Sequence, residues 1–227
     1  MRTLLADSLT AGWVEIRGDE AHHGRTVLRL AQGDHIRLAD GAGQVAAGVV
    51  AQVARDRLVI HCVAPTPVED PPAIHLTIAA AAPKGDRLAD LVRMLSELGV
   101  GRYVPLLTER GEREQVNAQR LDRIAREALK QSRRGRLLAI DPPRSLAELG
   151  GILVVCDPAG KPARPGPMSE ITVIIGPEGG LTAAELAALA ARGAMAVRLG
   201  GNILRIETAA AAAAAVWGTA WEARHHD

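Results

Sequence analysis

Residues 171–209 contain two short apolar segments, and each of them runs directly into a glycine-rich loop. The β-branched run at 171–175 is typical of a strand that is buried on both faces, and 195–199 is a second strand-like segment. The first loop is Gly176-Pro177-Glu178-Gly179-Gly180, and the second is Gly200-Gly201-Asn202. Two loops at the carboxyl ends of successive strands are typical of an open α/β sheet, which binds its ligands at that edge.

A helix is expected between the two strands. Thr182 and Glu185 have the spacing of a capping box, and Gly193 is a plausible helix stop. The same alternation of strand and helix patterns occupies the preceding hundred or so residues, so we expect a parallel sheet with helices on both faces. The other expected strands are 74–82, 103–107, 137–140 and 152–156, and the other helices are 86–98, one capped by Asn117, and 206 to about 224.

The first 64 residues have a different texture and predict an all-β module. Strand-like segments at 35–39 and 45–53 flank Asp40-Gly41-Ala42-Gly43, which is a strong hairpin signal. These glycines also resemble the start of a dinucleotide fingerprint, but they lie between two strands, so the hairpin is the better interpretation. The proline-rich segment 65–72 predicts a stiff linker. We therefore expect one domain at 1–70 and another at 71–227.

Composition limits the class of protein. The 227 residues carry a formal net charge of +1 and are 48% hydrophobic but only 2% aromatic, which favours close-packed α/β layers of aliphatic side chains. No signal peptide or long uncharged apolar span is evident, so we expect a cytoplasmic protein without membrane contact. Cys62 and Cys156 lie in apolar runs and are expected to be reduced. The adjacent His22 and His23 cannot both face a metal from one regular element, so no metal site is expected.

Basic residues are concentrated between Arg110 and Arg136, where nine of them stand against four acidic residues. On the helix capped by Asn117, the predicted exposed face carries Arg120, Arg123, Arg126 and Lys130. A solvated helix face with an Arg123–Glu127 pair accounts for the middle of this segment. It accounts poorly for the flanking arginines, so a phosphate-contacting patch is favoured.

Three shorter motifs leave alternatives open. Lys84-Gly85-Asp86-Arg87 opens a helix, where it either holds an anion or is an N-cap with two surface cations. The segment 20–29, which includes both histidines, is either an RNA-facing basic turn or a solvated loop. The loop at 176–180 lacks the pattern of a nucleoside-triphosphate cradle, so it is either a small-molecule pocket or a tight structural turn.

Taken together, the motifs resemble the ribosomal RNA small-subunit methyltransferase E (RsmE) family of the SPOUT superfamily. The motifs that carry the resemblance are His22-His23 with Val27-Leu28-Arg29, Lys84-Gly85-Asp86-Arg87, Glu97-Leu98-Gly99-Val100, Thr108-Glu109-Arg110, Glu127-Ala128 with Gln131-Ser132, Gly176 to Gly180, and Leu199-Gly200 followed by Ile203-Leu204-Arg205 and Glu207-Thr208-Ala209. They span the chain from Arg2 to the last helix. Departures at Arg133 and at Leu137-Leu138 affect the expected details of RNA contact.

The resemblance implies a PUA-like β-barrel followed by an α/β domain with a trefoil knot, an obligate homodimer, and methylation of a uridine N3 in the 16S rRNA of the small ribosomal subunit. It also implies that S-adenosylmethionine binds the two glycine loops. The expected cofactor-binding residues are Gly176, Pro177, Glu178, Gly179, Gly180, Leu199, Gly200, Asn202, Ile203 and Leu204. The expected RNA-binding residues are Arg2, His22, His23, Arg25, Arg29, Lys84, Arg87, Arg110, Arg113, Arg133 and Arg134.

Three residues are catalytic candidates on chemical grounds. Arg205 can stabilise a developing uridine anion, and Glu178 or Glu207 can accept the N3 proton. For Glu207 a structural role near a helix N-terminus is the better interpretation. Two other functions stay open, namely methylation of another RNA position, such as a ribose hydroxyl, and a non-catalytic RNA-binding or ribosome-assembly protein.

Overall fold

The computed structural model describes residues 1–68, 75–111, 117–165 and 170–225, with side chains up to residue 219. The chain divides into two compact units. The first comprises residues 1–70 together with 126–137, and the second comprises 71–125 together with 138–227. The helix α3 (Ala118–Ser132) therefore contributes its first half to one unit and its second half to the other.

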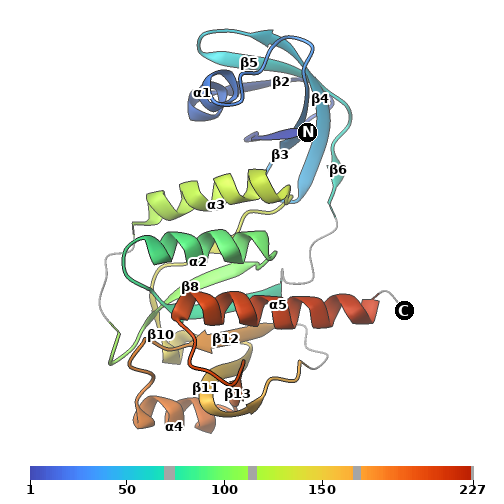
Figure 1. Cartoon of the computed structure of the whole chain (residues 1–227). Helices are drawn as coiled ribbons and strands as arrows, with labels where there is room; N and C mark the ends of the chain where they lie inside the picture. The colour runs from blue at the N-terminus through green and yellow to red at the C-terminus, as the bar shows by residue number, and fades with distance from the viewer. Residues whose placement is uncertain (69–74, 112–116, 166–169, 226–227) are drawn as a thin grey trace. The chain divides into compact units, whose positions relative to one another are not determined.

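The first unit is built on a six-stranded sheet with the order β1-β3-β4-β5-β2, in which β6 pairs with β4 (Figure 1). The strands are β1 (Arg2–Leu5), β2 (Gly12–Arg17), β3 (His35–Ala39), β4 (Gln44–Val53), β5 (Arg57–Cys62) and β6 (Thr66–Pro67). The predicted hairpin between β3 and β4 is confirmed. Its turn is held by Asp40 Oδ1, which accepts hydrogen bonds from the amides of Ala42 and Gln44 at 2.7 and 2.9 Å.

The prediction that residues 1–64 are all β is wrong, because α1 (Gly18–Thr26) lies between β2 and β3. The polar motif expected to be a turn is this helix. Only Ala21 and Gly24 are buried, so the sequence carries no apolar stripe that reveals a helix. At Gly24 an added Cβ would lie 2.6 Å from Cδ1 of Leu58, which shows how closely α1 packs against β5.

The segment 126–137 completes the first unit. Leu129 packs in a small apolar cluster with Leu5 and Ala39. Main-chain hydrogen bonds join Gly135 to Gly43 and Leu137 to Gly41. Lys130 was predicted to be exposed, and this is wrong: its side chain is buried and forms ion pairs with other members of the same unit. Leu137 is bonded here, so the strand expected to begin at that residue begins only at Ala139.

The second unit contains the predicted parallel sheet, with the order β10-β8-β7-β12-β11-β13 and β9 beside β8. Among the described residues, all strand pairs of this sheet are parallel. The strands are β7 (Leu76–Ala81), β8 (Arg102–Leu107), β9 (Ala139–Ile140), β10 (Arg144–Ser145), β11 (Ile152–Pro162), β12 (Ile171–Ile175) and β13 (Met195–Arg198). The strand β11 is longer than predicted because it pairs a second time with β13 beyond a register shift at Cys156.

Helices cover both faces of this sheet, as predicted. The helix α4 (Ala183–Ala191) packs Leu189 into a cluster with Ala79 and Ile174. The helices α2 (Asp86–Glu97) and α5 (Ile206–His225) pack against each other, and α5 also contacts β7 and β12 (Figure 1). All five residues of β12 are buried, which requires cover on both sides. A short 3-10 helix, η2 (Leu146–Glu148), precedes β11.

The predicted stop glycine Gly193 is confirmed, since it has a φ of +79° at the end of α4, and Gly99 has the same φ at the end of α2. Within the part of the chain that the structure describes, no helix combines the length and apolar character needed to cross a membrane.

Candidate functional site

A cavity of about 480 Å³ lies in the second unit, where β12 and β13 end and β11 passes Cys156. Both glycine loops line it. All ten residues predicted to bind the cofactor are among the lining residues: Gly176, Pro177, Glu178, Gly179, Gly180, Leu199, Gly200, Asn202, Ile203 and Leu204. The sequence pattern placed these loops at one sheet edge, and the fold brings them around one cavity.

The first loop turns sharply before α4. The amide of Gly180 donates to the carbonyl of Pro177 at 2.8 Å, and Gly180 has a φ of +69°, a conformation that favours glycine. The predicted capping box is confirmed at the loop's far end. Thr182 Oγ1 accepts from the amide of Glu185 at 3.2 Å, and Glu185 Oε2 accepts from the amide of Thr182 at 2.7 Å.

Side chains from two other segments hold the first loop. Arg87, in the first turn of α2, lies 3.2 Å from Oε1 of Glu178. Arg110, in the segment after β8, donates to the carbonyl of Gly179 at 2.8 Å. Neither contact was predicted, because both arginines were assigned to RNA.

The second loop is more open. An added Cβ at Gly200 or at Gly201 would meet no atom within 4 Å, and neither residue has a positive φ. Only Gly200 is a lining residue of the cavity. Ile203 is 87% exposed, which is unusual for a large aliphatic side chain. The loop ends where the carbonyl of Arg205 accepts from the amide of Ala209 at 2.8 Å in the first turn of α5.

The three catalytic candidates occupy different environments. Arg205 and Glu178 line the cavity. Glu207 does not: it is buried in the first turn of α5, and its Oε2 has no hydrogen-bond partner among the described residues. The structural interpretation of Glu207, a carboxylate near a helix N-terminus, fits this position.

The sequence did not single out the part of the cavity that β11 contributes, which consists of Cys156, Asp157 and Pro158. Burial raises the pKa of the Cys156 thiol to about 12, so this group is protonated at neutral pH and is a poor nucleophile. These residues line the cavity because β11 lies between β12 and β13 in the sheet. That order is not visible from one sequence.

The RNA-binding candidates of the first unit differ in accessibility. Arg25 and Arg133 are exposed, as are His22 and Arg29, whereas His23 is half-buried. Arg2 donates to the carbonyl of Leu28 at 2.6 Å and lies 3.4 Å from Asp34. Arg134 is only 8% exposed, and its carbonyl accepts from Arg37. That Arg134 contacts RNA stays a prediction, and it concerns a side chain that is largely buried.

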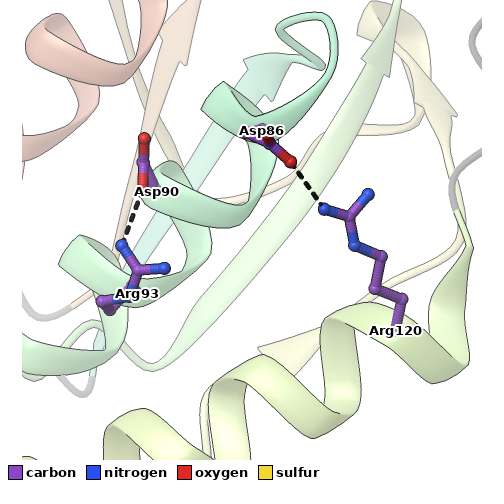
Figure 2. A network of polar contacts seen from close by, with 4 residues as sticks. All are labelled: Asp86, Asp90, Arg93 and Arg120. Carbon is purple, nitrogen blue, oxygen red and sulfur yellow. Dashed lines mark hydrogen bonds and ion pairs between the residues drawn. The ribbon is translucent and has the colours of Figure 1, made fainter.

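In the second unit, Lys84 and Arg110 are exposed and Arg87 is half-buried. Arg113 lies outside the described residues. Arg120, on α3, lies 2.9 Å from Asp86 on α2, and Arg93 lies 2.6 Å from Asp90, both on α2. Figure 2 shows both contacts. Part of the basic surface is thus neutralised within the unit. Among the side chains that the structure describes, no three His, Cys, Asp or Glu residues are grouped so as to hold a metal ion.

Two family models of RNA methyltransferases match this chain. Residues 69–218 match the family model described as "RNA methyltransferase domain", and residues 16–61 match the model described as "RNA methyltransferase PUA domain". The predicted fold class, a parallel α/β sheet preceded by a PUA-like module, is confirmed by these matches and by the observed sheet.

Individual relatives are similar to this chain in sequence along most of its length. Ribosomal RNA small subunit methyltransferase E of Mycobacterium bovis is 31% identical over 93% of this chain and 89% of its own, and that of Rickettsia conorii is 30% identical over 89% and 88%. The crystal structure of the enzyme of that name from Neisseria gonorrhoeae, bound to S-adenosyl methionine, is 25% identical, with a TM-score of 0.88 over 97% of this chain and 98% of that one. The chain belongs to the ribosomal RNA small subunit methyltransferase E family.

Proposed function

We propose that this protein uses S-adenosylmethionine to methylate N3 of a uridine in the 16S rRNA of the small ribosomal subunit. The observation that carries the proposal is the convergence of both glycine loops on one cavity at the carboxyl edge of a parallel sheet. Ligands of open α/β proteins bind at this edge. The family supports the reaction class, and the relative from Neisseria gonorrhoeae was crystallised with S-adenosyl methionine.

The residues around the cavity fit this cofactor. A volume of about 480 Å³ lies within the roughly 300–1,000 Å³ range of small-molecule sites. The carboxylates of Glu178 and Asp157 are suited to a ligand with an ammonium group and a sulfonium. The open space at Gly200 leaves its main chain accessible to a planar base. We assign the adenine to the main chain of 199–204 and the ribose and methionine portions to 176–180.

When bound, S-adenosylmethionine supplies an electrophilic methyl group. The protein must then make uridine N3 nucleophilic, because this nitrogen carries a weakly acidic proton. Arg205 lines the cavity from the end of the second loop, and its guanidinium can stabilise negative charge on the uracil ring as that proton leaves. We assign this role to Arg205. The base must also leave its stack to reach the cavity, so the target nucleotide is expected in irregular or accessible RNA.

The two glutamates differ in their access to the cavity. Glu178 lines the cavity and remains the candidate proton acceptor, although its carboxylate is engaged by Arg87. Glu207 is buried outside the cavity lining, so a role in α5 is favoured over proton transfer. We further propose a cytoplasmic homodimer and a knotted path through the two loops, as the family resemblance implies. The domain boundary near residue 70 is part of the same proposal.

Isothermal titration calorimetry with S-adenosylmethionine tests the cofactor assignment. We expect one binding site per chain. A protein that binds RNA but shows no heat with S-adenosylmethionine would instead support the alternative of a non-catalytic RNA-binding or ribosome-assembly factor.

A further inference from the structure

We propose that Arg110 is a positioning residue for the cofactor loop at 176–180, and that it acts on cofactor affinity and not on RNA affinity. This inference rests on the proposed function. It reassigns a residue whose charge and neighbours in sequence favour an RNA contact.

Arg110 contacts the main chain of the loop directly. Nη1 of Arg110 donates to the carbonyl oxygen of Gly179 at 2.8 Å, although the residues are 69 positions apart. An added Cβ at Gly179 would lie 3.6 and 3.7 Å from the Cδ and Cβ of Arg110, so the stem of the arginine lies against the loop. Both the charged head and the aliphatic stem are therefore engaged with the main chain that lines the cavity.

The need for such a contact follows from the loop's composition. Gly179 and Gly180 have no side chains with which to fix their own conformation, and glycine has more conformational freedom to lose than any other residue. A main-chain hydrogen bond within the loop joins Gly180 to Pro177. A hydrogen bond from a charged donor to the carbonyl of Gly179 adds a restraint from outside the loop, and such a bond is stronger than one between neutral groups.

The segment that carries Arg110 is itself anchored. Oε1 of Glu185 accepts from the amide of Glu109 at 2.9 Å, while Oε2 of the same carboxylate accepts from the amide of Thr182. One glutamate thus caps α4 and ties it to the residue before Arg110. Arg110 therefore donates from a segment that is itself hydrogen-bonded to α4, the helix that follows the loop.

The other arginine on the loop is expected to contribute less. Arg87, which is half-buried, forms an ion pair with Glu178, whose side chain is exposed, and ion pairs near the surface contribute little to stability. Arg110 bonds the main chain instead, and main-chain position decides the shape of the cavity. Arg110 is thus the residue that the structure selects for a test.

The test measures two affinities on the purified full-length protein. Calorimetry gives the Kd for S-adenosylmethionine without RNA, and steady-state methylation of small ribosomal subunits gives KM for the particle. Arg110→Ala is expected to raise the Kd for S-adenosylmethionine about tenfold while KM for the particle stays within about twofold. Arg110→Lys, which keeps a charged donor, is expected to recover part of the affinity. Arg93→Ala removes an arginine of the same unit that pairs with Asp90, and it is the control.

The opposite pattern would overturn the inference. If Arg110→Ala binds S-adenosylmethionine as tightly as the wild type while KM for the particle rises, Arg110 contacts RNA. Should Arg110→Ala fail to fold, the same two measurements on Arg110→Lys decide, because imperfect replacement then raises the Kd for the cofactor or the KM for the particle. A wild type that does not bind S-adenosylmethionine would refute the proposed function instead, so the two failures are distinguishable.

Discussion

The Nζ atom of Lys130 lies 3.1 Å from Oε2 of Glu20, although 110 residues separate them in the chain. The lysine side chain is 7% exposed and also lies 2.7 Å from Glu127. The other oxygen of Glu20 accepts from the amide of Leu5 at 2.9 Å. This pair therefore joins the end of α3 to α1 and β1 within the first unit. It compensates an ammonium that is otherwise costly to bury.

Removing Glu20 should destabilise the protein. Glu20→Ala leaves Lys130 buried with only Glu127 beside it, and losing one partner of a buried pair costs roughly 3–5 kcal/mol. Because the Glu20 side chain is 22% exposed, we expect about 2–3 kcal/mol, which is below that range. Urea denaturation followed by circular dichroism measures the free energy of unfolding. The control is Asp19→Ala, which changes an exposed residue in the same helical turn. An equal decrease in both variants would show that the Glu20–Lys130 pair does not stabilise the fold.

Lys130 also shows why part of the fold was predictable and part was not. The helix expected after Asn117 is confirmed, since a helix cap and apolar periodicity are features of the local sequence. Whether the Lys130 side chain is buried depends on its contact with Glu20 of α1, 110 positions earlier in the chain, and no local pattern carries that information. The same limit explains α1, whose two small buried residues give no apolar stripe.

The candidate site also has a part that was predictable from the sequence and a part that was not. The two glycine loops were predictable because each follows an apolar strand, and the sheet brings both to one edge. Asp157 and the contacts of Arg87 and Arg110 were not predictable, because they depend on which strands are neighbours and on the loops' conformations. Charge alone assigned both arginines to RNA.

Two adjacent glycines give a matched test of the second loop. Gly200→Ala and Gly201→Ala both add a methyl group that meets no protein atom within 4 Å, so neither should destabilise the fold. Only Gly200 lines the cavity. We expect Gly200→Ala to raise the Kd for S-adenosylmethionine about tenfold or more by crowding the ligand, with Gly201→Ala near the wild type. Calorimetry on both variants decides, and equal affinities would place the adenine elsewhere.

Arg205 should affect the chemical step more than cofactor binding. A guanidinium that stabilises charge in the transition state resembles an oxyanion-hole donor, and loss of such a donor lowers kcat by about 10²–10³. We expect Arg205→Ala to show this loss on small ribosomal subunits while the Kd for S-adenosylmethionine changes by less than about threefold. Full turnover of Arg205→Ala would exclude the assigned role. Glu207→Gln, a change outside the cavity lining, should retain most of the activity.

The oligomeric state is open to direct measurement. Ile203 is 87% exposed and Met195 is 44% exposed, so the second unit presents large apolar side chains to solvent at both positions. A second chain that covers them would account for this exposure. We expect sedimentation equilibrium at micromolar concentration to give the mass of a dimer. A monomer under these conditions would contradict the proposed homodimer.

The product of the reaction tests the central claim most directly. Small ribosomal subunits from a strain that lacks this protein are incubated with the purified enzyme and methyl-labelled S-adenosylmethionine, and the rRNA is digested to nucleosides for mass spectrometry. The proposed function predicts one labelled product, 3-methyluridine, and less of that product with the Gly200→Ala variant at limiting cofactor. Label on a ribose hydroxyl or on another base, or no label in the rRNA, would contradict it.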